Sequence, residues 1–309
     1  MQAVNHDNDF IFGEQISIAE VESSQDLDLF WAGSFDNRTD DLLFSAALVL
    51  TAEVSTAAVG LELFASIHTG HGEDVIKGIG TASTTVSATT SVSMTVLIEA
   101  INASKINSTV VASAFAQAIA EATAVGIDSS GLISTGSGDD LIIGEATANG
   151  VAEAIANATA DVFTFSDETS SIDSDVFTNL LSQTEVRATA IGIRGGQYNL
   201  GKGSDTVIAR ATGVGVNIGV QDVLIHGGKG HDTFDLQSGT GEIMGGKGRD
   251  LLLLEGSLSD YTFTPLDASL GVTIQNSLNH TNLLVSEVEE FQFSGNADSI
   301  FQFADLVLA

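Results

Sequence analysis

Five short turns with the pattern G-x-G-x-D carry the residues of this chain that are best suited to chemistry. They are Gly70-His71-Gly72-Glu73-Asp74, Gly136-Ser137-Gly138-Asp139-Asp140, Gly201-Lys202-Gly203-Ser204-Asp205, Gly228-Lys229-Gly230-His231-Asp232 and Gly246-Lys247-Gly248-Arg249-Asp250. Glycine adopts backbone conformations closed to other residues, so carbonyl oxygens can turn toward one point, and each aspartate adds a carboxylate. An all-oxygen ligand set of this kind favours a hard cation, above all calcium.

The turns recur at a regular distance, which indicates stacked structural units. Asp74 and Asp140 are 66 residues apart, and Asp205 follows 65 residues later. A matching glycine, at Gly60, Gly126 and Gly192, precedes each of the first three turns by a similar distance. Such regularity is typical of a solenoid whose coils lie one on another.

Small residues alternate with larger ones between the turns. Three such runs are Ala112, Ala114, Ala116, Ala118, Ala120, Ala122 and Ala124; then Ala146, Ala148, Gly150, Ala152, Ala154, Ala156, Ala158 and Ala160; then Ala209, Ala211, Gly213 and Gly215. A period of two predicts strands of roughly 50 Å with one small-residue face, which lets two sheets approach closely. Alanine-rich stretches also suit a helix, but the strict alternation and the Thr, Val and Ile content favour strands.

The turns resemble the calcium-binding nonapeptide G-G-x-G-x-D-x-U-x of the RTX family. This resemblance implies carboxylate ligands from one residue of each turn: Asp74, Asp140, Asp205, Asp232 and Asp250. It implies carbonyl ligands from the paired glycines: Gly70, Gly72, Gly136, Gly138, Gly201, Gly203, Gly228, Gly230, Gly246 and Gly248. The turns 227–232 and 245–250 match best, since their 18-residue offset equals two nonapeptides. The earlier turns begin with Thr69, Thr135 or Leu200 in place of glycine, so empty structural corners are the alternative there.

We therefore expect an all-β fold, a parallel β-solenoid whose wide coils narrow toward the C-terminus. The expected parts are a cap region at 1–50, the solenoid at 51–256 and an antiparallel β cap at 257–309. Between the last two turns, Gly241 stands where the intermediate nonapeptide would have aspartate, so calcium binding is expected to be poor on that side. An antiparallel meander or sandwich of long hairpins is the competing topology.

Composition limits the partners and suggests a location. Ten basic and 41 acidic residues give a formal charge of −31, which makes nucleic acid an improbable partner and calcium a favourable one. The chain has no cysteine, no apolar stretch long enough for a spanning helix and no basic-apolar signal at its start. Its last residues, Asp305-Leu-Val-Leu-Ala309, are similar to the C-terminal signal of type I secretion substrates. We expect a secreted protein that stays loose at low cytosolic calcium and folds outside the cell.

The sequence gives little support for catalysis. It has neither an H-E-x-x-H motif nor a G-x-S-x-G motif. His68 with His71, and His226 with His231, could approach one another in stacked turns as a transition-metal site, but solvated histidines are the simpler interpretation. The expected function is a calcium-binding structural or adhesive module that contacts a cell-surface or matrix component. The alternatives are an enzyme without a recognisable motif, or ice or surface binding through the row Ser83, Thr85, Ser87, Thr89, Ser91, Ser93 and Thr95.

Overall fold

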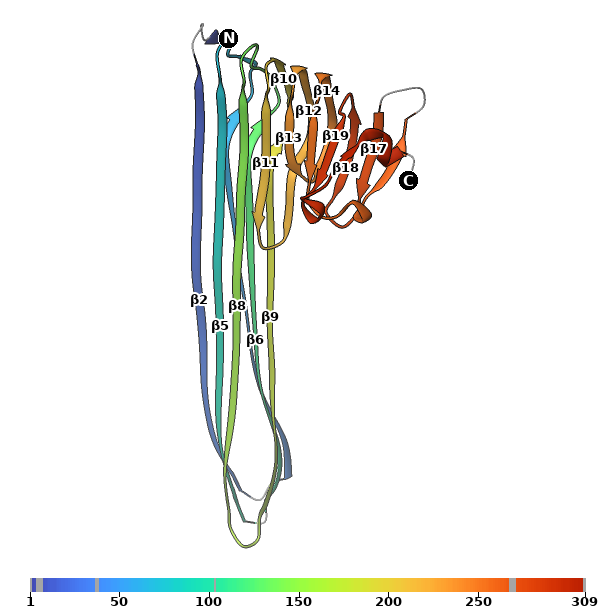
Figure 1. Cartoon of the computed structure of the whole chain (residues 1–309). Helices are drawn as coiled ribbons and strands as arrows, with labels where there is room; N and C mark the ends of the chain where they lie inside the picture. The colour runs from blue at the N-terminus through green and yellow to red at the C-terminus, as the bar shows by residue number, and fades with distance from the viewer. Residues whose placement is uncertain (1, 4–7, 37–38, 103, 267–270, 308–309) are drawn as a thin grey trace.

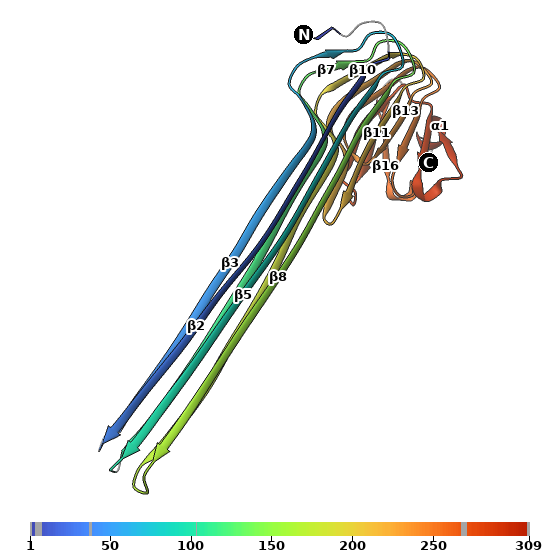
Figure 2. The same ribbon diagram turned by 90° about the vertical axis from the view of Figure 1, so that its left-hand side faces the viewer.

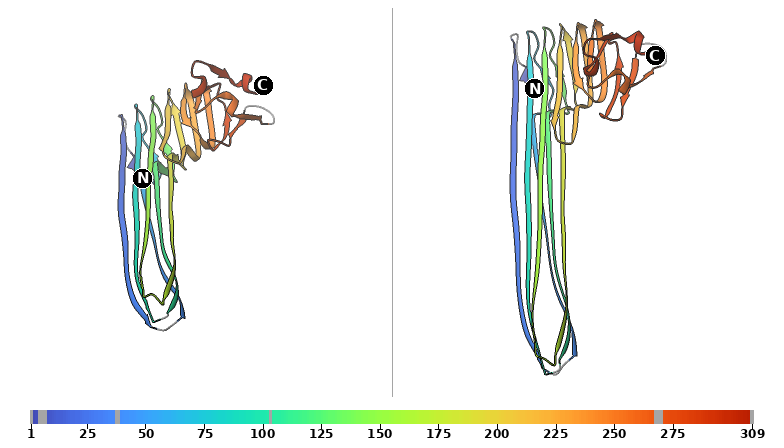
Figure 3. Two further views of the ribbon diagram at one scale, coloured as in Figure 1. Left: turned by 90° about the horizontal axis from the view of Figure 1, so that it is seen from below. Right: turned by 60° about the horizontal axis from the view of Figure 1, so that its bottom comes forward.

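The structure is a computed structural model that describes residues 2–3, 8–36, 39–102, 104–266 and 271–307. Six long strands form a flat two-layered blade, and shorter strands continue the same stack as a compact roll (Figure 1). The blade consists of β2 (Phe10–Asp36), β3 (Thr39–Leu63), β5 (Val75–Ile101), β6 (Lys105–Ser129), β8 (Leu141–Ser166) and β9 (Ser171–Arg194). The blade projects well past the roll in both views of Figure 3.

Two sheets face each other through the whole stack. The outgoing sheet has the order β2-β5-β8-β11-β13-β15-β19-β20, where β11 is Thr206–Gly213, β13 is Thr233–Gln237 and β15 is Leu251–Leu254. The return sheet holds β3, β6 and β9 and, past a bend near the base, the short strands that lead into the turns (Figure 2). These are β1 (Gln2–Ala3), β4 (Ile67–His68), β7 (Leu132–Ser134), β10 (Gln197–Lys202), β12 (Val216–Gly230) and β14 (Gly239–Gly248).

The pairing is parallel and in register with the repeat. Gly78 pairs with Gly144 in the outgoing sheet. In the return sheet, Ala58 pairs with Ala124, and Ala124 pairs with Ala190 on its other side. Residues one repeat apart therefore lie side by side in neighbouring coils, as a wide-coil solenoid predicts. The parallel solenoid is confirmed, and the sandwich of antiparallel hairpins is wrong.

The repeated glycines mark the level at which the two sheets touch. A Cβ on Gly126 would lie 2.4 Å from the backbone N of Glu145 in the opposite sheet. A Cβ on Gly78 would lie 2.2 Å from the carbonyl oxygen of Gly126. We call this level the glycine waist. Beyond it the blade interior is filled mainly by small side chains, among them Ala82, Ala122 and Ala148, so the predicted close approach of the sheets is confirmed.

The coils narrow abruptly after the third. The strand β11 follows β8 only as far as the pair Gly213 and Ala148, and the return strand β12 begins at Val216. The predicted narrowing of the coils toward the C-terminus is confirmed, but the alternation through Gly213 and Gly215 does not continue a strand. Both glycines have positive φ, 136° and 108°, and they form the tip of a short coil instead of continuing a strand.

The two ends of the stack differ. At the C-terminal end, β16 (Thr262–Pro265), β17 (Gly271–Asn276) and β18 (Thr281–Ser286) form an antiparallel sheet, and β18 pairs with β14 in parallel. The strand β19 (Glu290–Phe293) extends the outgoing sheet, β20 (Ile300–Gln302) pairs with it antiparallel, and α1 (Phe303–Val307) follows. This confirms the expected antiparallel closure. At the N-terminal end, the expected boundary between residues 50 and 51 lies inside β3, which is the return strand of the first wide coil.

Candidate calcium-binding edge

The five predicted turns lie in one column along the base of the molecule, the upper edge in Figure 1. Each leads from a short strand of the return sheet into a strand of the outgoing sheet. The φ angles of all ten predicted glycines are positive, from 96° at Gly201 to 150° at Gly248. A Cβ at Gly248 would also lie 1.5 Å from the carbonyl oxygen of Gly230. Both the conformation and the spacing of the coils therefore require glycine.

The aspartates of the column form a continuous hydrogen-bonded ladder. The backbone N–H of Asp74 donates to Oδ1 of Asp140 over 2.9 Å, and that of Asp140 donates to Oδ1 of Asp205 over 2.8 Å. The same contact joins Asp205 to Asp232 over 2.9 Å and Asp232 to Asp250 over 2.8 Å. The ladder is independent of coil length, since it spans offsets of 66, 65, 27 and 18 residues. The predicted column of Asp74, Asp140 and Asp205 is thus present.

The second carboxylate oxygen of each ladder residue has no protein partner. The five residues are at most 2 % exposed, and Oδ2 of each is buried without a hydrogen bond. Buried polar atoms are almost always satisfied, because removing them from water costs free energy that nothing else returns. A row of buried, unpartnered carboxylate oxygens therefore points to a cation as the missing partner.

Burial also disturbs the ionisation of the ladder. It raises the pKa of Asp140 and Asp232, that of Asp205 to about 7 and that of Asp250 to about 6. The neighbouring carboxylates raise the pKa of Asp205 and Asp250 further, whereas the N–H donated by the preceding turn lowers it. Without a counter-charge the buried column therefore resists full ionisation.

The last two turns differ from the first two at the residue that precedes the G-x-G-x-D motif. A Cβ on Gly227 would lie 2.3 Å from Oδ2 of Asp232, and a Cβ on Gly245 would lie 2.6 Å from Oδ2 of Asp250. The equivalent positions of the first two turns are buried threonines. The Thr135 hydroxyl donates to the carbonyl of Leu200 over 2.9 Å, and that of Thr69 donates to the carbonyl of Thr135 over 3.1 Å. In the last two turns, Oδ2 of the aspartate thus lies directly against a glycine, where a side chain would collide with it.

Sequence reasoning missed two further members of the ladder. The N–H of Asp9 donates to Oδ1 of Asp74 over 2.8 Å, so Asp9 begins the column. Its position 65 residues before Asp74, directly ahead of Phe10-Ile11, was the signal that could have found it. At the other end, the N–H of Asp250 donates to Oε2 of Glu289 over 2.9 Å. Glu289 belongs to no motif, and only the fold of the C-terminal cap brings it to the column.

Other side-chain clusters offer less. Within the described part of the chain, no three side chains of His, Cys, Asp or Glu surround a common point, so a cation at the base needs backbone ligands. One histidine of each predicted pair contacts a residue of the neighbouring coil: Nδ1 of His71 lies 2.5 Å from Oγ of Ser137, and Nδ1 of His231 accepts the N–H of Arg249 over 3.0 Å. No helix among the described residues has the length and apolar character to cross a membrane.

The Ser/Thr row lies on the outer face of β5, half-buried between two different strands. At the level of Ser87 the neighbours are Glu22 on β2 and Glu153 on β8. Similarly, Ser91 lies between Asp26 and Asn157. The hydroxyl array is therefore one strand wide, and its flanking strands present a mixture of acidic, polar and apolar residues, such as Ile18 and Ile155.

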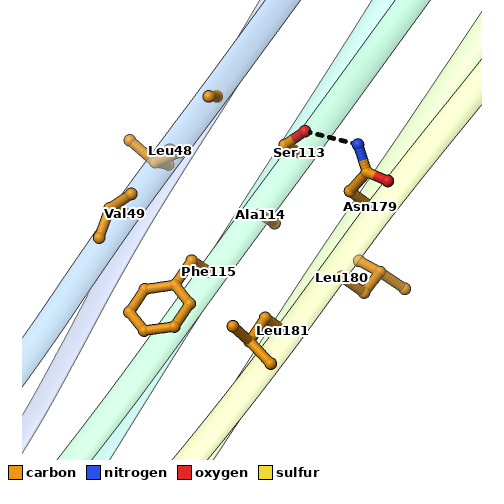
Figure 4. A pocket seen from close by; sticks show the side chains of 9 residues that line it. Leu48, Val49, Ser113, Ala114, Phe115, Asn179, Leu180 and Leu181 are labelled. Carbon is orange, nitrogen blue, oxygen red and sulfur yellow. Dashed lines mark hydrogen bonds between the residues drawn. The ribbon is translucent and has the colours of Figure 1, made fainter.

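A shallow hollow crosses the outer face of the return sheet (Figure 4). Val49, Phe115 and Leu181 form one row across the three wide coils. Beside them, Nδ2 of Asn179 donates to Oγ of Ser113 over 3.2 Å. The described residues that line the hollow include no carboxylate, imidazole or thiol, so it is an apolar surface feature.

Comparisons with known protein families, with curated proteins and with solved structures found no match to this chain.

Proposed function

We propose that this protein is a calcium-binding structural module similar to RTX proteins, whose base is ordered by calcium and whose blade presents an extended surface. The observation that carries this proposal is the column of buried Oδ2 atoms without partners beside turns of positive-φ glycines. Aspartate and backbone carbonyl oxygens match the ligand preference of calcium. A bound divalent ion would also stabilise the ionised form of the buried aspartates, which burial otherwise disfavours.

The best-supported site lies at the last two turns. Asp232 and Asp250 would supply carboxylate oxygens there, and the turns 227–232 and 245–250 would supply carbonyls. The close approach of Oδ2 to Gly227 and Gly245, where the family pattern has glycine, supports this choice over the first two turns, where threonine hydroxyls already bond to the neighbouring coil. The Asp74, Asp140 and Asp205 turns are weaker candidates, and corners held by the aspartate ladder alone are the alternative for them.

Calcium dependence would connect folding to location. A chain with a formal charge of −31 and a buried carboxylate column is disfavoured where calcium is scarce and stabilised where it is millimolar. We therefore propose an extracellular protein, exported by a C-terminal signal. The Asp305 carboxylate accepts the N–H of Gln302 at the start of α1, and the last two residues of the terminal motif lie outside the described part of the chain.

Ice or crystal-face binding is the second candidate, favoured by the straight Ser/Thr row on β5. Its width of one strand and its acidic neighbours favour the structural or adhesive role. Thermal hysteresis measured for the protein and for Thr85→Lys would separate the two. Hysteresis that disappears in the variant would support ice binding, and its absence in both would leave the structural role.

Calorimetric titration with calcium tests the main proposal. We expect binding in the wild type, loss of the strongest site in Asp232→Ala and a smaller effect in Asp250→Ala, where Glu289 takes the place of a further turn. Asp235→Ala is the matched control, since its carboxylate pairs with Arg210 away from the column. If Asp232→Ala binds the same number of calcium ions as the wild type, the turn has only a structural role and does not bind calcium.

A further inference from the structure

The abrupt narrowing of the stack leaves the third wide coil uncovered on one side. The strand β11 covers β8 up to Ala148, and β12 covers β9 from Thr189 onward. No described strand pairs with residues 149–166 of β8 or 171–188 of β9 on this side. We call these two segments the shoulder. They present unpaired N–H and C=O groups in both sheets at once, which is the arrangement most prone to pair with another chain.

The shoulder is also apolar. Val176, Leu180 and Val186 point toward the blade interior yet are 45 %, 58 % and 43 % exposed, because no fourth wide coil covers them. The outward row adds large exposed side chains at Val151, Phe163, Phe165, Phe177 and Leu181. Leu180 and Leu181 leave β9 on opposite sides in Figure 4. A solenoid end of this kind requires a cap.

We propose that the shoulder is a dimer interface, covered by the shoulder of a second copy of this chain in antiparallel orientation. The occupant must supply two long strands together, one for each sheet, at the separation of the two layers. Another blade supplies both. At about 3.3 Å per residue the shoulder is roughly 60 Å long, and with sheets about 10 Å apart it offers roughly 600 Å² per copy, which reaches the range of stable interfaces.

The roll decides the orientation. A parallel copy in the same register would place its base where β11 and β12 already lie, so it is excluded sterically. A two-fold axis along the blade would bring the two rolls together. A two-fold axis normal to the sheets reverses the second blade instead, so that its tip ends where the first roll begins. This symmetry closes the assembly as a dimer.

The limits of the shoulder also fix the register. If residues 171–187 overlap fully with their symmetry mates, Phe177 of one copy faces Leu181 of the other, and Asn179 faces Asn179. In the outgoing sheet, Val151 then faces Phe165. Glu185 of one copy then faces Asp173 of the other. Arg187, which pairs with Glu185 and Glu121 in its own copy, lies diagonally within reach of that Asp173 and separates the two carboxylates. Two pairs of large exposed side chains thus meet, whereas Phe163 faces Glu153.

Cysteine cross-linking tests the register, because the chain has no cysteine of its own. We expect Asn179→Cys to form a disulfide-linked dimer under mild oxidation in calcium. Ala47→Cys is the matched control, since Ala47 lies in the same row on the first coil, two strands away from Asn179. Cross-linking of Ala47→Cys but not of Asn179→Cys would overturn the proposal and assign the contact to the N-terminal edge.

The mass of the wild-type protein in solution provides the second test. We expect a dimer by light scattering at tens of micromolar, with a dissociation constant at least tenfold higher for Leu181→Lys. Val49→Lys, in the same row on the first coil, should leave it unchanged. A monomeric wild type at 100 micromolar, folded by circular dichroism, would refute the dimer whether or not calcium binds. Equal weakening by both variants would refute this interface.

Discussion

The backbone N–H of Asp232 donates to Oδ1 of Asp250, 18 residues further along the chain, over 2.8 Å. The same bond joins Asp74 to Asp140, 66 residues apart. One local geometry therefore fixes the stacking of wide and narrow coils alike. It also leaves Oδ2 of every ladder residue facing inward without a partner, and the predictions for the base follow from that pair of facts.

Replacing Asp232 by asparagine separates the ladder from the cation. Asp232→Asn keeps an oxygen to accept the N–H of Asp205 but removes a buried negative charge. We expect the variant to melt at the same or a higher temperature than the wild type in chelator, and lower by roughly 5 °C or more in millimolar calcium. Thermal melting followed by circular dichroism measures both. Identical shifts in the two buffers would contradict a cation at this turn.

The glycine before each of the last two turns should be as important as the carboxylate. Gly227→Ala places a Cβ where 2.3 Å separates it from Oδ2 of Asp232. We expect at least a tenfold loss of calcium affinity at this turn, measured by calorimetry. The reverse change, Thr135→Gly, should cost stability in chelator, because the bond to the Leu200 carbonyl is lost, and should increase the response to calcium. A Gly227→Ala protein with wild-type affinity would place the ion elsewhere.

The metal-free protein should be more stable in mild acid than above neutrality. The folded-state pKa of Asp205 is about 7 and that of Asp250 about 6, both above the ordinary value of 3.8. Groups raised in this way contribute stability that is complete below the unfolded pKa and is lost as the pH rises through the folded pKa. We expect the melting temperature in chelator to fall between pH 4 and pH 8.

Asp205→Asn is the control for this pH dependence. It should flatten the upper part of the profile, because the residue with the highest of these pKa values no longer titrates. A wild-type profile in chelator that rises from pH 4 to pH 8 would contradict the raised pKa values.

The glycine waist should tolerate no side chain. Gly126→Val drives a branched side chain against the backbone of Glu145, only 2.4 Å from the Cβ position. We expect destabilisation of roughly 3 kcal/mol or more, or failure to fold. Thr123→Val, on the exposed outer face of the same strand, should change stability by less than about 0.5 kcal/mol. Denaturant unfolding measures both, and equal stability of the two variants would mean that the sheets separate easily at this level.

Much of the fold was predictable because its signals are local. Glycines that need positive φ mark the corners, and alternation of small and large residues marks the strands between them. The repeat length, which is the number of residues from Asp74 to Asp140, then fixes which strands lie side by side. The same residues identify the candidate cation edge, since the turn that positions each carboxylate is contained in five consecutive residues.

The features that the sequence did not reveal depend on where each coil ends and what stacks beside it. Gly213 and Gly215 continue an alternating pattern in the sequence, and their positive φ angles show that they form the tip of the short fourth coil. Asp9 and Glu289 join the ladder because whole segments stack on either side of it.

Sequence by itself determined the repeating unit of this protein, its corners, its strands and the carboxylates of its base. The unequal spacing of the turns also predicted that the coils narrow. Tertiary structure alone decided which residues form the tip of the short coil, and with it the limits of the uncovered shoulder and the two ends of the ladder. The physical reason is that a turn is set by the conformations open to its own residues. Which segment packs beside the end of a strand depends instead on the lengths of segments that are far away in the chain.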